Sequence, residues 1–254
     1  MTFHIRDSVF LVTGANRGIG KVILETALQR GAKKVYAAVR DVQTADDLVE
    51  THGDQVIPVR LDLNDPSSVR EAALVAKDVN VVVNNAGVLQ VCSAFADETI
   101  ETLQYEMEAN VYGLIRVAQA FAPVLKANGG GVFVQLNSVA SLNATPEFAT
   151  YCASKAAAYS ITLGLRKSLQ EQGTLVVSAH PGPIQTDMGR SAGFGEFASD
   201  PAIVAPAIFD AIEQGHFHAW IGPLAELISE PYQPFVEQIL SGDMKQLREQ
   251  AFGL

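Results

Sequence analysis

A tyrosine and a lysine that stand four residues apart, Tyr151 and Lys155, have types and spacing suited to acid–base chemistry. On a helix, side chains four residues apart share a face, so the phenol and the ammonium point into one region. A free tyrosine has a pKa of about 10, and a nearby cation lowers this pKa toward a working pH. Tyr151 is therefore a candidate proton donor to a carbonyl, or proton acceptor from an alcohol. Such pairs also occur on solvated helix faces, so this one needs support from other residues.

A serine that follows a predicted strand gives part of this support. Ser138 comes after Asn137 at the end of the run 131–136, and enzymes built on parallel sheets place site residues at the carboxyl ends of strands. A serine hydroxyl there could hold a substrate oxygen as a second donor. Ser141 competes for this role, and an ordinary turn serine is the plainer alternative.

A glycine-rich segment, residues 13–20 with the sequence TGANRGIG, joins the first predicted strand to the first predicted helix. Glycines at such a junction let the backbone approach a pyrophosphate, whose charge is met by the helix N-terminus. The spacing G-x-x-x-G-x-G differs from the usual G-x-G-x-x-G fingerprint. Taken alone, the segment is also compatible with a tight strand-to-helix turn.

These residues need a scaffold to position them, and the hydrophobic pattern predicts one. Strands are predicted at 9–12, 34–39, 56–61, 79–83, 131–136, 175–179 and 218–221. Helices are predicted at 19–30, 44–52, from Pro66 onward, 99–125, 151–172, 201–214 and in the tail to 254. Alternation at this spacing predicts an α/β fold, with a parallel sheet of about seven strands between two helical layers.

The organisation along the chain is predicted to be simple. No linker or repeat divides the sequence, so residues 1–254 are expected to form one domain. The stretch 186–200 is apolar and contains three glycines. Such a stretch inside a compact domain is expected to be a substrate-binding loop or lid.

Composition excludes several classes of function. The 254 residues include 18 Lys and Arg and 28 Asp and Glu, for a net charge of −10, so a basic face for nucleic acid is not expected. Two cysteines are too few for a disulfide framework. The uncharged stretch 127–146 holds a glycine triplet and several amides, which argue against a membrane span. With no signal-like apolar run near residue 1, a soluble, cytoplasmic protein is expected.

Together these residues resemble the single-domain branch of the short-chain dehydrogenase/reductase family. The resemblance covers about residues 9–186 and implies a Rossmann-type, doubly wound fold. It rests on five motifs in order: the glycine turn 13–20, NNAG at 84–87, Asn110, Ser138 with Tyr151 and Lys155, and PGPIQT at 181–186.

In this family a serine–tyrosine–lysine site lies beside a nicotinamide cofactor. The resemblance implies that Tyr151 delivers the proton while the cofactor delivers a hydride, and that Ser138 hydrogen-bonds the reacting oxygen. Lys155 would bind the nicotinamide ribose and lower the pKa of Tyr151. Asn110 would support a water relay that returns protons to the site, besides kinking its helix.

The resemblance also implies a set of cofactor contacts. Asp62 matches the position that bonds the adenine amino group, although a turn aspartate at a strand end is the alternative. Ile184 and Thr186 match positions that hold the nicotinamide carboxamide. The full expected set is Gly14, Asn16, Arg17, Gly18, Ile19, Gly20, Arg40, Asp62, Leu63, Asn85, Ala86, Gly87, Tyr151, Lys155, Pro181, Gly182, Ile184 and Thr186.

The residues near the second predicted strand favour NADP(H) over NAD(H). An NAD enzyme typically places a carboxylate at the end of this strand, to accept from the ribose 2′-OH. Here the strand ends at Val39 and Arg40 follows, while Arg17 lies inside the glycine turn. Two guanidiniums could clamp a 2′-phosphate. Asp41 would oppose this if the strand ended one residue later.

The predicted substrate is a neutral, apolar ketone, aldehyde or secondary alcohol. No arginine among the candidate pocket residues could bind a substrate carboxylate. These candidates are mostly apolar: Val88, Leu89, Leu142, Asn143, Ala144, Phe148, Met188, Phe194 and Phe197. The five histidines form no convincing ligand cluster, so no metal is expected.

The leading interpretation is an NADPH-dependent carbonyl reductase, reversible as an alcohol dehydrogenase. One alternative is a 3-oxoacyl-carrier-protein reductase, although the sequence after NNAG differs from the usual one and only Arg166 and Lys167 offer basic charge to an acidic carrier. A second alternative is a nucleotide-sensing regulator without turnover. The resemblance further implies a homotetramer or homodimer, built through the predicted helices 99–125 and 151–172 and the C-terminal region.

Overall fold

Seven parallel strands form a single sheet in the order β3-β2-β1-β4-β5-β6-β7. The computed structural model describes residues 3–235 of the chain. The strands are β1 (Val9–Thr13), β2 (Lys34–Val39), β3 (Val56–Arg60), β4 (Val81–Asn84), β5 (Gly131–Leu136), β6 (Thr174–Pro181) and β7 (His218–Ile221).

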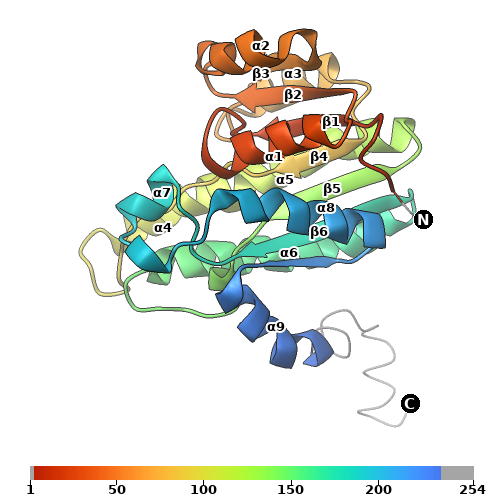
Figure 1. Cartoon of the computed structure of the whole chain (residues 1–254). Helices are drawn as coiled ribbons and strands as arrows, with labels where there is room; N and C mark the ends of the chain where they lie inside the picture. The colour runs from red at the N-terminus through yellow and green to blue at the C-terminus, as the bar shows by residue number, and fades with distance from the viewer. Residues whose placement is uncertain (1–2, 236–254) are drawn as a thin grey trace.

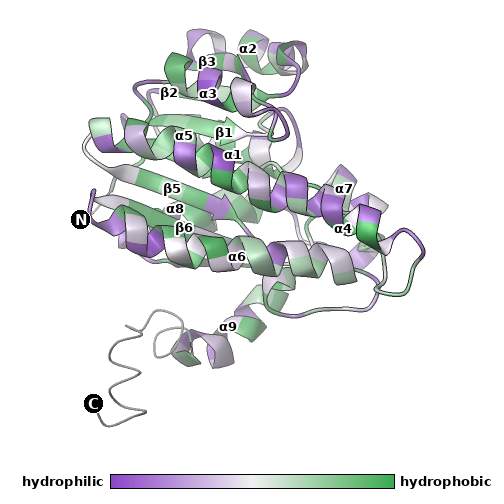
Figure 2. Ribbon diagram, turned by 180° about the vertical axis from the view of Figure 1, so that it is seen from behind, coloured by the Kyte–Doolittle hydropathy of each residue, from purple (hydrophilic) through white to green (hydrophobic). Residues whose placement is uncertain are grey.

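Helices cover both faces of this sheet. Figure 1 shows α1 and α8 in front of the sheet, and Figure 2, seen from behind, shows α5 and α6 on the opposite face. The helices are α1 (Gly18–Gln29), α2 (Asp46–His52), α3 (Pro66–Val75), α4 (Thr99–Met107), α5 (Gly113–Ala127), α6 (Ala149–Gln170), α7 (Asp187–Ser191), α8 (Val204–Gln214) and α9 (Pro223–Phe235). The predicted α/β class with a doubly wound parallel sheet is confirmed.

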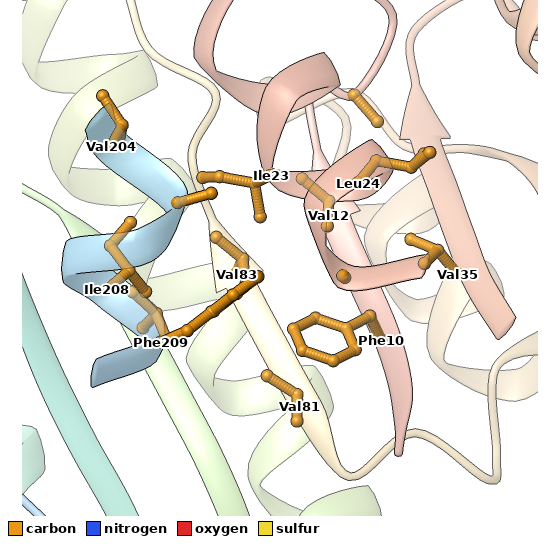
Figure 3. Packing of buried hydrophobic residues seen from close by; sticks show 14 of the residues in the cluster. Phe10, Val12, Ile23, Leu24, Val35, Val81, Val83, Val204, Ile208 and Phe209 are labelled. Carbon is orange, nitrogen blue, oxygen red and sulfur yellow. The ribbon is translucent and has the colours of Figure 1, made fainter. Parts of the chain in front are cut away.

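Alternating side chains on each strand feed two separate hydrophobic cores, because successive residues of a strand point to opposite faces. On β1, Phe10 and Val12 pack toward α1 and α8, whereas Val9 and Leu11 pack on the other face. Figure 3 shows the first core, where the Phe10 ring meets Phe209 of α8 edge-on at 5.8 Å between centroids. Both faces of the strands are therefore apolar, as the uninterrupted β-branched runs predict.

The strand order reverses between β1 and β4, and this reversal places the site. From β1 the chain winds outward through β2 to β3, then returns to the other side of β1 with β4 and continues to β7. The loops at the carboxyl ends of β1 and β4 therefore diverge and leave a crevice, which is where open α/β sheets bind ligands.

Several element boundaries differ from the sequence predictions. The helix expected at 99–125 is divided by a π turn, Glu108–Tyr112. The strand expected at 79–83 begins at Val81, since the Asn80 side chain rather than a strand backbone accepts from the Val9 amide (2.8 Å). The loop 186–200 contains the short helix α7. The predicted helical tail is present as α9, and its remainder lies outside the described residues.

Across residues 3–235, no helix combines the length and apolarity needed to cross a membrane.

Candidate active site

The glycine turn after β1 brings the backbone at Gly14 close to helix α1 and to the segment after β4. Gly14 and Gly18 have positive φ angles of 66° and 52°, which favour glycine. A side chain at Gly20 would place its Cβ 2.2 Å from the Gly14 carbonyl oxygen. Helix α1 begins at Gly18, and no side chain caps its first amides. The turn is thus a backbone cradle at an open helix N-terminus, which suits the phosphates of a dinucleotide.

The NNAG segment at the end of β4 is fastened to this turn. The Thr13 hydroxyl accepts from the amides of Asn85 and Ala86, both at 2.9 Å, and Asn85 Nδ2 donates to the Thr13 carbonyl at 2.8 Å. Buried Asn84 continues the network to Gln135 of β5 at 2.7 Å. These bonds hold the carboxyl ends of β1, β4 and β5 in a fixed relation.

Ser138, Tyr151 and Lys155 line one cavity at this edge of the sheet. Ser138 follows β5, and its Oγ accepts from the Ala140 amide at 3.1 Å. Tyr151 and Lys155 lie one turn apart on α6, with the Lys155 Nζ 5.8 Å from the centroid of the Tyr151 ring. Ser141, the competing serine, is buried and uses its Oγ to accept from the Ser138 amide at 3.3 Å. The geometry therefore favours Ser138 over Ser141 as the group that faces a ligand.

The protonation of this cluster is governed first by burial. Burial raises the pKa of Tyr151, while the hydrogen bond with the Ser138 side chain lowers it. The sequence predicted a lowered pKa, because that argument weighed the Lys155 cation but not the loss of solvent. Burial likewise lowers the pKa of Lys155 to about 8, and its ammonium donates to the Leu136 carbonyl at 2.8 Å.

Asn110 lies in the π turn and its side chain holds the segment after β4. Its Oδ1 accepts from the Val88 amide and its Nδ2 donates to the Val88 carbonyl, both at 2.9 Å. Nδ2 also donates to the Ser154 hydroxyl at 3.0 Å. A π turn inside a helix frequently marks a functional site. The side chain acts here as a brace, and its part in a proton relay stays a prediction.

The predicted cofactor contacts form two groups. Nine residues line the cavity, drawn from the ends of β4 and β6 and from α1 and α6: Ile19, Asn85, Gly87, Tyr151, Lys155, Pro181, Gly182, Ile184 and Thr186. The remainder lie outside it, in the glycine turn and after β2, β3 and β4: Gly14, Asn16, Arg17, Gly18, Gly20, Arg40, Asp62, Leu63 and Ala86.

The second group fits the far half of an elongated ligand, since the ends of β1, β2 and β3 succeed one another along the sheet edge. Asp62 Oδ1 accepts from the Asn64 amide at 3.0 Å, so this carboxylate also shapes its own turn. Leu63 is buried, and its side chain packs where Gly113 leaves room for it. Its placement is thereby explained by packing.

The end of β2 is arranged as the sequence predicted. The strand ends at Val39, and the exposed Arg40 follows it. Asp41 Oδ1 accepts from the Gln43 amide at 3.1 Å and so caps the next turn. Arg17, on the glycine turn, has its guanidinium 3.5 Å from Asp187 of α7.

The cavity as a whole has a volume of about 240 Å³, and most of its lining is apolar. Six of the predicted pocket residues line it: Val88, Leu89, Asn143, Phe148, Met188 and Phe194. Three do not: Leu142 packs against a hydrophobic core, Ala144 is exposed, and Phe197 is 89% exposed. Phe194 reaches the pocket because its ring packs against Phe148 at 5.6 Å.

Sequence reasoning missed several pocket residues, some of them from a distant segment. Cys152 of α6 follows Tyr151 and points into the cavity, whereas Leu224 and Ile228 of α9 close it from the C-terminal side. For Leu224 and Ile228, the one signal in the sequence was the helical spacing of apolar residues in α9. Within the described part of the chain, no three His, Cys, Asp or Glu side chains gather as metal ligands.

Buried His180 of β6 was also missed, and it lies behind Ser138. Its Nδ1 is 3.1 Å from the Ser138 carbonyl oxygen and its Nε2 is 2.8 Å from the Ser178 hydroxyl. Burial lowers the pKa of His180 to about 3. The neutral ring thus braces the serine backbone from the core side.

A parallel doubly wound sheet with a glycine cradle at its crevice defines a dinucleotide-binding α/β protein. The short-chain dehydrogenase family model matches residues 8–195, and the chain belongs to this family of oxidoreductases, whose fold binds a nicotinamide cofactor.

Relatives of known sequence or structure agree with this assignment. The chain is 31% identical over 196 residues to an uncharacterised oxidoreductase of Staphylococcus epidermidis, covering 76% of this chain and 84% of the relative. A short-chain dehydrogenase of Burkholderia cenocepacia, solved in complex with NADP, is 34% identical with a TM-score of 0.84, covering 94% of this chain and all of the other. A family member of Burkholderia phymatum in complex with NAD, 23% identical with a TM-score of 0.78 over 95% and 99% of the chains, shares the fold.

Proposed function

We propose that the chain is an NADPH-dependent carbonyl reductase, reversible as an alcohol dehydrogenase, for apolar ketones, aldehydes or secondary alcohols. One observation carries this proposal: Ser138, Tyr151 and Lys155 line one cavity whose remaining lining is mostly apolar. That cavity opens beside the glycine cradle, where Cβ atoms at Gly14 or Gly20 would meet neighbouring atoms within 3.4 Å. The cradle therefore fits a nicotinamide dinucleotide, which would supply the hydride when bound.

The three polar side chains have separable tasks in this proposal. The buried, protonated Tyr151 donates its proton to the carbonyl oxygen of the substrate, and accepts it in the reverse direction. The Ser138 hydroxyl, held by the Ala140 amide, donates a second hydrogen bond to the same oxygen. The Lys155 ammonium lies 5.8 Å from the centre of the Tyr151 ring. Its positive charge favours ionisation of the phenol and so opposes the effect of burial on the phenol. The apolar residues around them exclude water and charged substrates.

The preference for NADPH is supported by the charges around β2. Arg40 is exposed at the end of the strand and Arg17 lies on the glycine turn, so both can reach an anionic group there. The Asp41 carboxylate is engaged with the Gln43 amide, which removes the main objection raised by the sequence. For Arg17 to clamp a phosphate, it must exchange its exposed ion pair with Asp187, which costs little in water.

A panel of ketones and aldehydes assayed with NADPH and NADH tests the proposal. We expect turnover of apolar ketones, with kcat/KM for NADPH at least about tenfold above that for NADH, the equivalent of one charge-assisted hydrogen bond. Equal kcat/KM values with both cofactors would contradict the recognition of the NADPH 2′-phosphate by Arg17 and Arg40. Turnover of acyl-carrier thioesters alone would favour the 3-oxoacyl-carrier-protein reductase, and cofactor binding without any turnover would favour the nucleotide-sensing regulator.

We also propose a homotetramer or homodimer in the cytoplasm. Large apolar side chains are exposed on and beside α4, among them Phe95, Ile100, Tyr105 and Tyr112. A second copy of the chain would cover such a surface. Light scattering on the purified protein measures the mass, and a monomer at micromolar concentration would contradict this part of the proposal.

A further inference from the structure

Glu106 of α4 carries a carboxyl group inside the protein, bonded to the segment that follows β4. Its side chain is fully buried. Oε1 accepts from the Gln90 amide at 2.9 Å, whereas Oε2 is buried and has no hydrogen-bond partner. Burying a carboxylate with so few partners is costly, so its presence at this position requires an explanation other than stability.

Glu106 and Asn110 together hold the segment that forms one wall of the pocket. They are four residues apart, which places them on one side of the helix. Asn110 binds the amide and the carbonyl of Val88, and Glu106 binds the amide of Gln90. In an extended segment, residues two apart present the same side. The two side chains therefore clamp both ends of a stretch whose Val88 and Leu89 line the cavity.

The charge of Glu106 acts on the candidate catalytic pair. Burial is the largest influence on Glu106 and raises its pKa, while the hydrogen bond from the Gln90 amide and the charge of Lys155 lower it. The nearby Thr150 hydroxyl is buried and forms no hydrogen bond. In return, Glu106 raises the pKa of both Tyr151 and Lys155.

The other ionisable groups around this carboxyl do not duplicate its effect. Cys152 also raises the pKa of Tyr151, and it is the remaining titratable group of α6 at this place. On the side of α4 that faces solvent, Glu101 is exposed. In the π turn, Glu108 forms an ion pair with Arg116 at 2.6 Å. Glu106 is thus the carboxylate that hydrogen-bonds the segment of the pocket wall and lies on a helix packed against α6, which carries the tyrosine and the lysine.

We propose that Glu106 is a positioning residue of the active site: it clamps the Val88–Gln90 wall and places a buried negative charge behind Tyr151 and Lys155. The pocket and pair on which it acts are those of the proposed function, so the inference rests on that function. Its effect follows from the sign of the charge. An ionised Glu106 favours the protonated phenol and the protonated ammonium, which are the forms that carbonyl reduction uses. The carboxylate therefore extends the activity toward higher pH.

Three substitutions separate the charge from the clamp. Glu106→Gln keeps the length and an oxygen for the Gln90 amide but removes the charge. Glu106→Asp keeps the charge but shortens the reach, and Glu106→Ala removes both. Glu101→Gln is the matched control, since it removes an exposed charge from the same helix. The measurement is kcat/KM for ketone reduction with NADPH between pH 6 and 10, with thermal unfolding as a check that each variant is folded.

For Glu106→Gln we expect the basic limb of the profile to move about one pH unit toward acid, since one buried charge no longer raises either pKa. The substrate KM should stay within about threefold. For Glu106→Asp the limb should stay in place while KM rises about tenfold, because one clamp bond worth about 1.4 kcal/mol is lost. Coincident profiles for the parent, Glu106→Gln and Glu101→Gln would overturn the proposal. If Glu106→Gln does not fold, a shifted limb in Glu106→Asp would overturn it.

A binding measurement keeps this inference separate from the proposed function. The dissociation constant of NADPH, measured by calorimetry across the same pH range, reports the charge of Lys155 without any turnover. We expect the affinity of Glu106→Gln to fall off at a pH about one unit lower than that of the parent. If no ketone is reduced but this shift is found, the proposed function fails and the role of Glu106 stands. An unshifted binding curve would contradict the role of Glu106.

Discussion

Replacing Gly20 by alanine has two opposing effects. Alanine is the better helix former, but its Cβ would clash where two backbone segments approach closely to form the cofactor cradle. The new Cβ would lie 2.2 Å from the Gly14 carbonyl oxygen and 2.7 Å from Asn85 Nδ2. Both atoms belong to the network that joins β1 to β4, since Asn85 Nδ2 donates to the Thr13 carbonyl. The backbone oxygen cannot rotate away, so the turn has to open by about 1 Å to reach ordinary contact distance.

A second helical glycine, Gly164 of α6, supplies the matched control. A Cβ at Gly164 meets nothing within 4 Å. In both helices alanine is intrinsically favoured over glycine by about 1 kcal/mol. We therefore expect Gly164→Ala to raise the free energy of unfolding by about 0.5–1 kcal/mol and the Tm by about 1–4 °C.

For Gly20→Ala the clash costs more free energy than the helix preference of alanine gains. Overpacking costs about 1–3 kcal/mol, and the Asn85 hydrogen bond that opens contributes about 1 kcal/mol more. We expect a net loss of about 1–3 kcal/mol, together with NADPH affinity weakened about tenfold or more because the cradle no longer fits a pyrophosphate. Urea unfolding and calorimetric titration with NADPH measure both quantities. A Gly20→Ala protein that gains stability like Gly164→Ala and binds NADPH like the parent would refute the reasoning.

Further predictions concern the cofactor, the core and the response to acid. Replacing Arg17 and Arg40 by alanine should lower kcat/KM with NADPH about 10- to 100-fold and change that with NADH less than about threefold; equal losses would contradict phosphate recognition. Phe10→Ala should cost about 3–5 kcal/mol in urea unfolding, because Phe10 is fully buried against Phe209; a cost below about 1 kcal/mol would contradict this packing. Because the pKa of His180 falls from 6.5 to about 3 on folding, the unfolded chain takes up a proton that the folded chain does not as the pH falls below 6.5. His180→Asn should therefore remove about 1.4 kcal/mol per pH unit from the acid loss of stability between pH 6 and 4, and an unchanged slope would show that His180 titrates normally.

The sheet and most of the site could be predicted because their signals are local. Residues 9–12 are apolar without interruption, as a strand buried on both faces requires, and Phe10 and Leu11 do enter opposite cores. The Tyr151–Lys155 spacing places both side chains on one wall of the cavity. Each inference used residues that are neighbours in the sequence and needed only the period of a strand or a helix.

The features that the sequence did not predict depend on contacts between distant segments. Glu106 lies in a polar sequence that resembles a solvated face, and it is buried because the segment after β4 folds back and donates the Gln90 amide. The π turn at Asn110 arises where the same segment binds the asparagine side chain. Leu224 reaches the pocket only because α9 packs beside β7 and the turn after β5. No periodicity in one segment reports such long-range burial.

The direction of the pKa of Tyr151 was wrong in the sequence analysis for a related reason. The spacing indicates that a cation is near, but not how much solvent the fold removes from the phenol. In the structure burial is the larger influence, and it raises the pKa. A protonated tyrosine at neutral pH agrees with a proton donor in carbonyl reduction.

The central claim is that Tyr151 transfers the proton in a carbonyl reduction. Tyr151→Phe keeps the ring and removes only the hydroxyl, so kcat/KM for an apolar ketone with NADPH tests the claim most directly. We predict a loss of about 10²- to 10⁴-fold, with the NADPH dissociation constant within about threefold of the parent because the glycine cradle is untouched. A Tyr151→Phe protein that reduces the ketone at the parent rate would contradict the account.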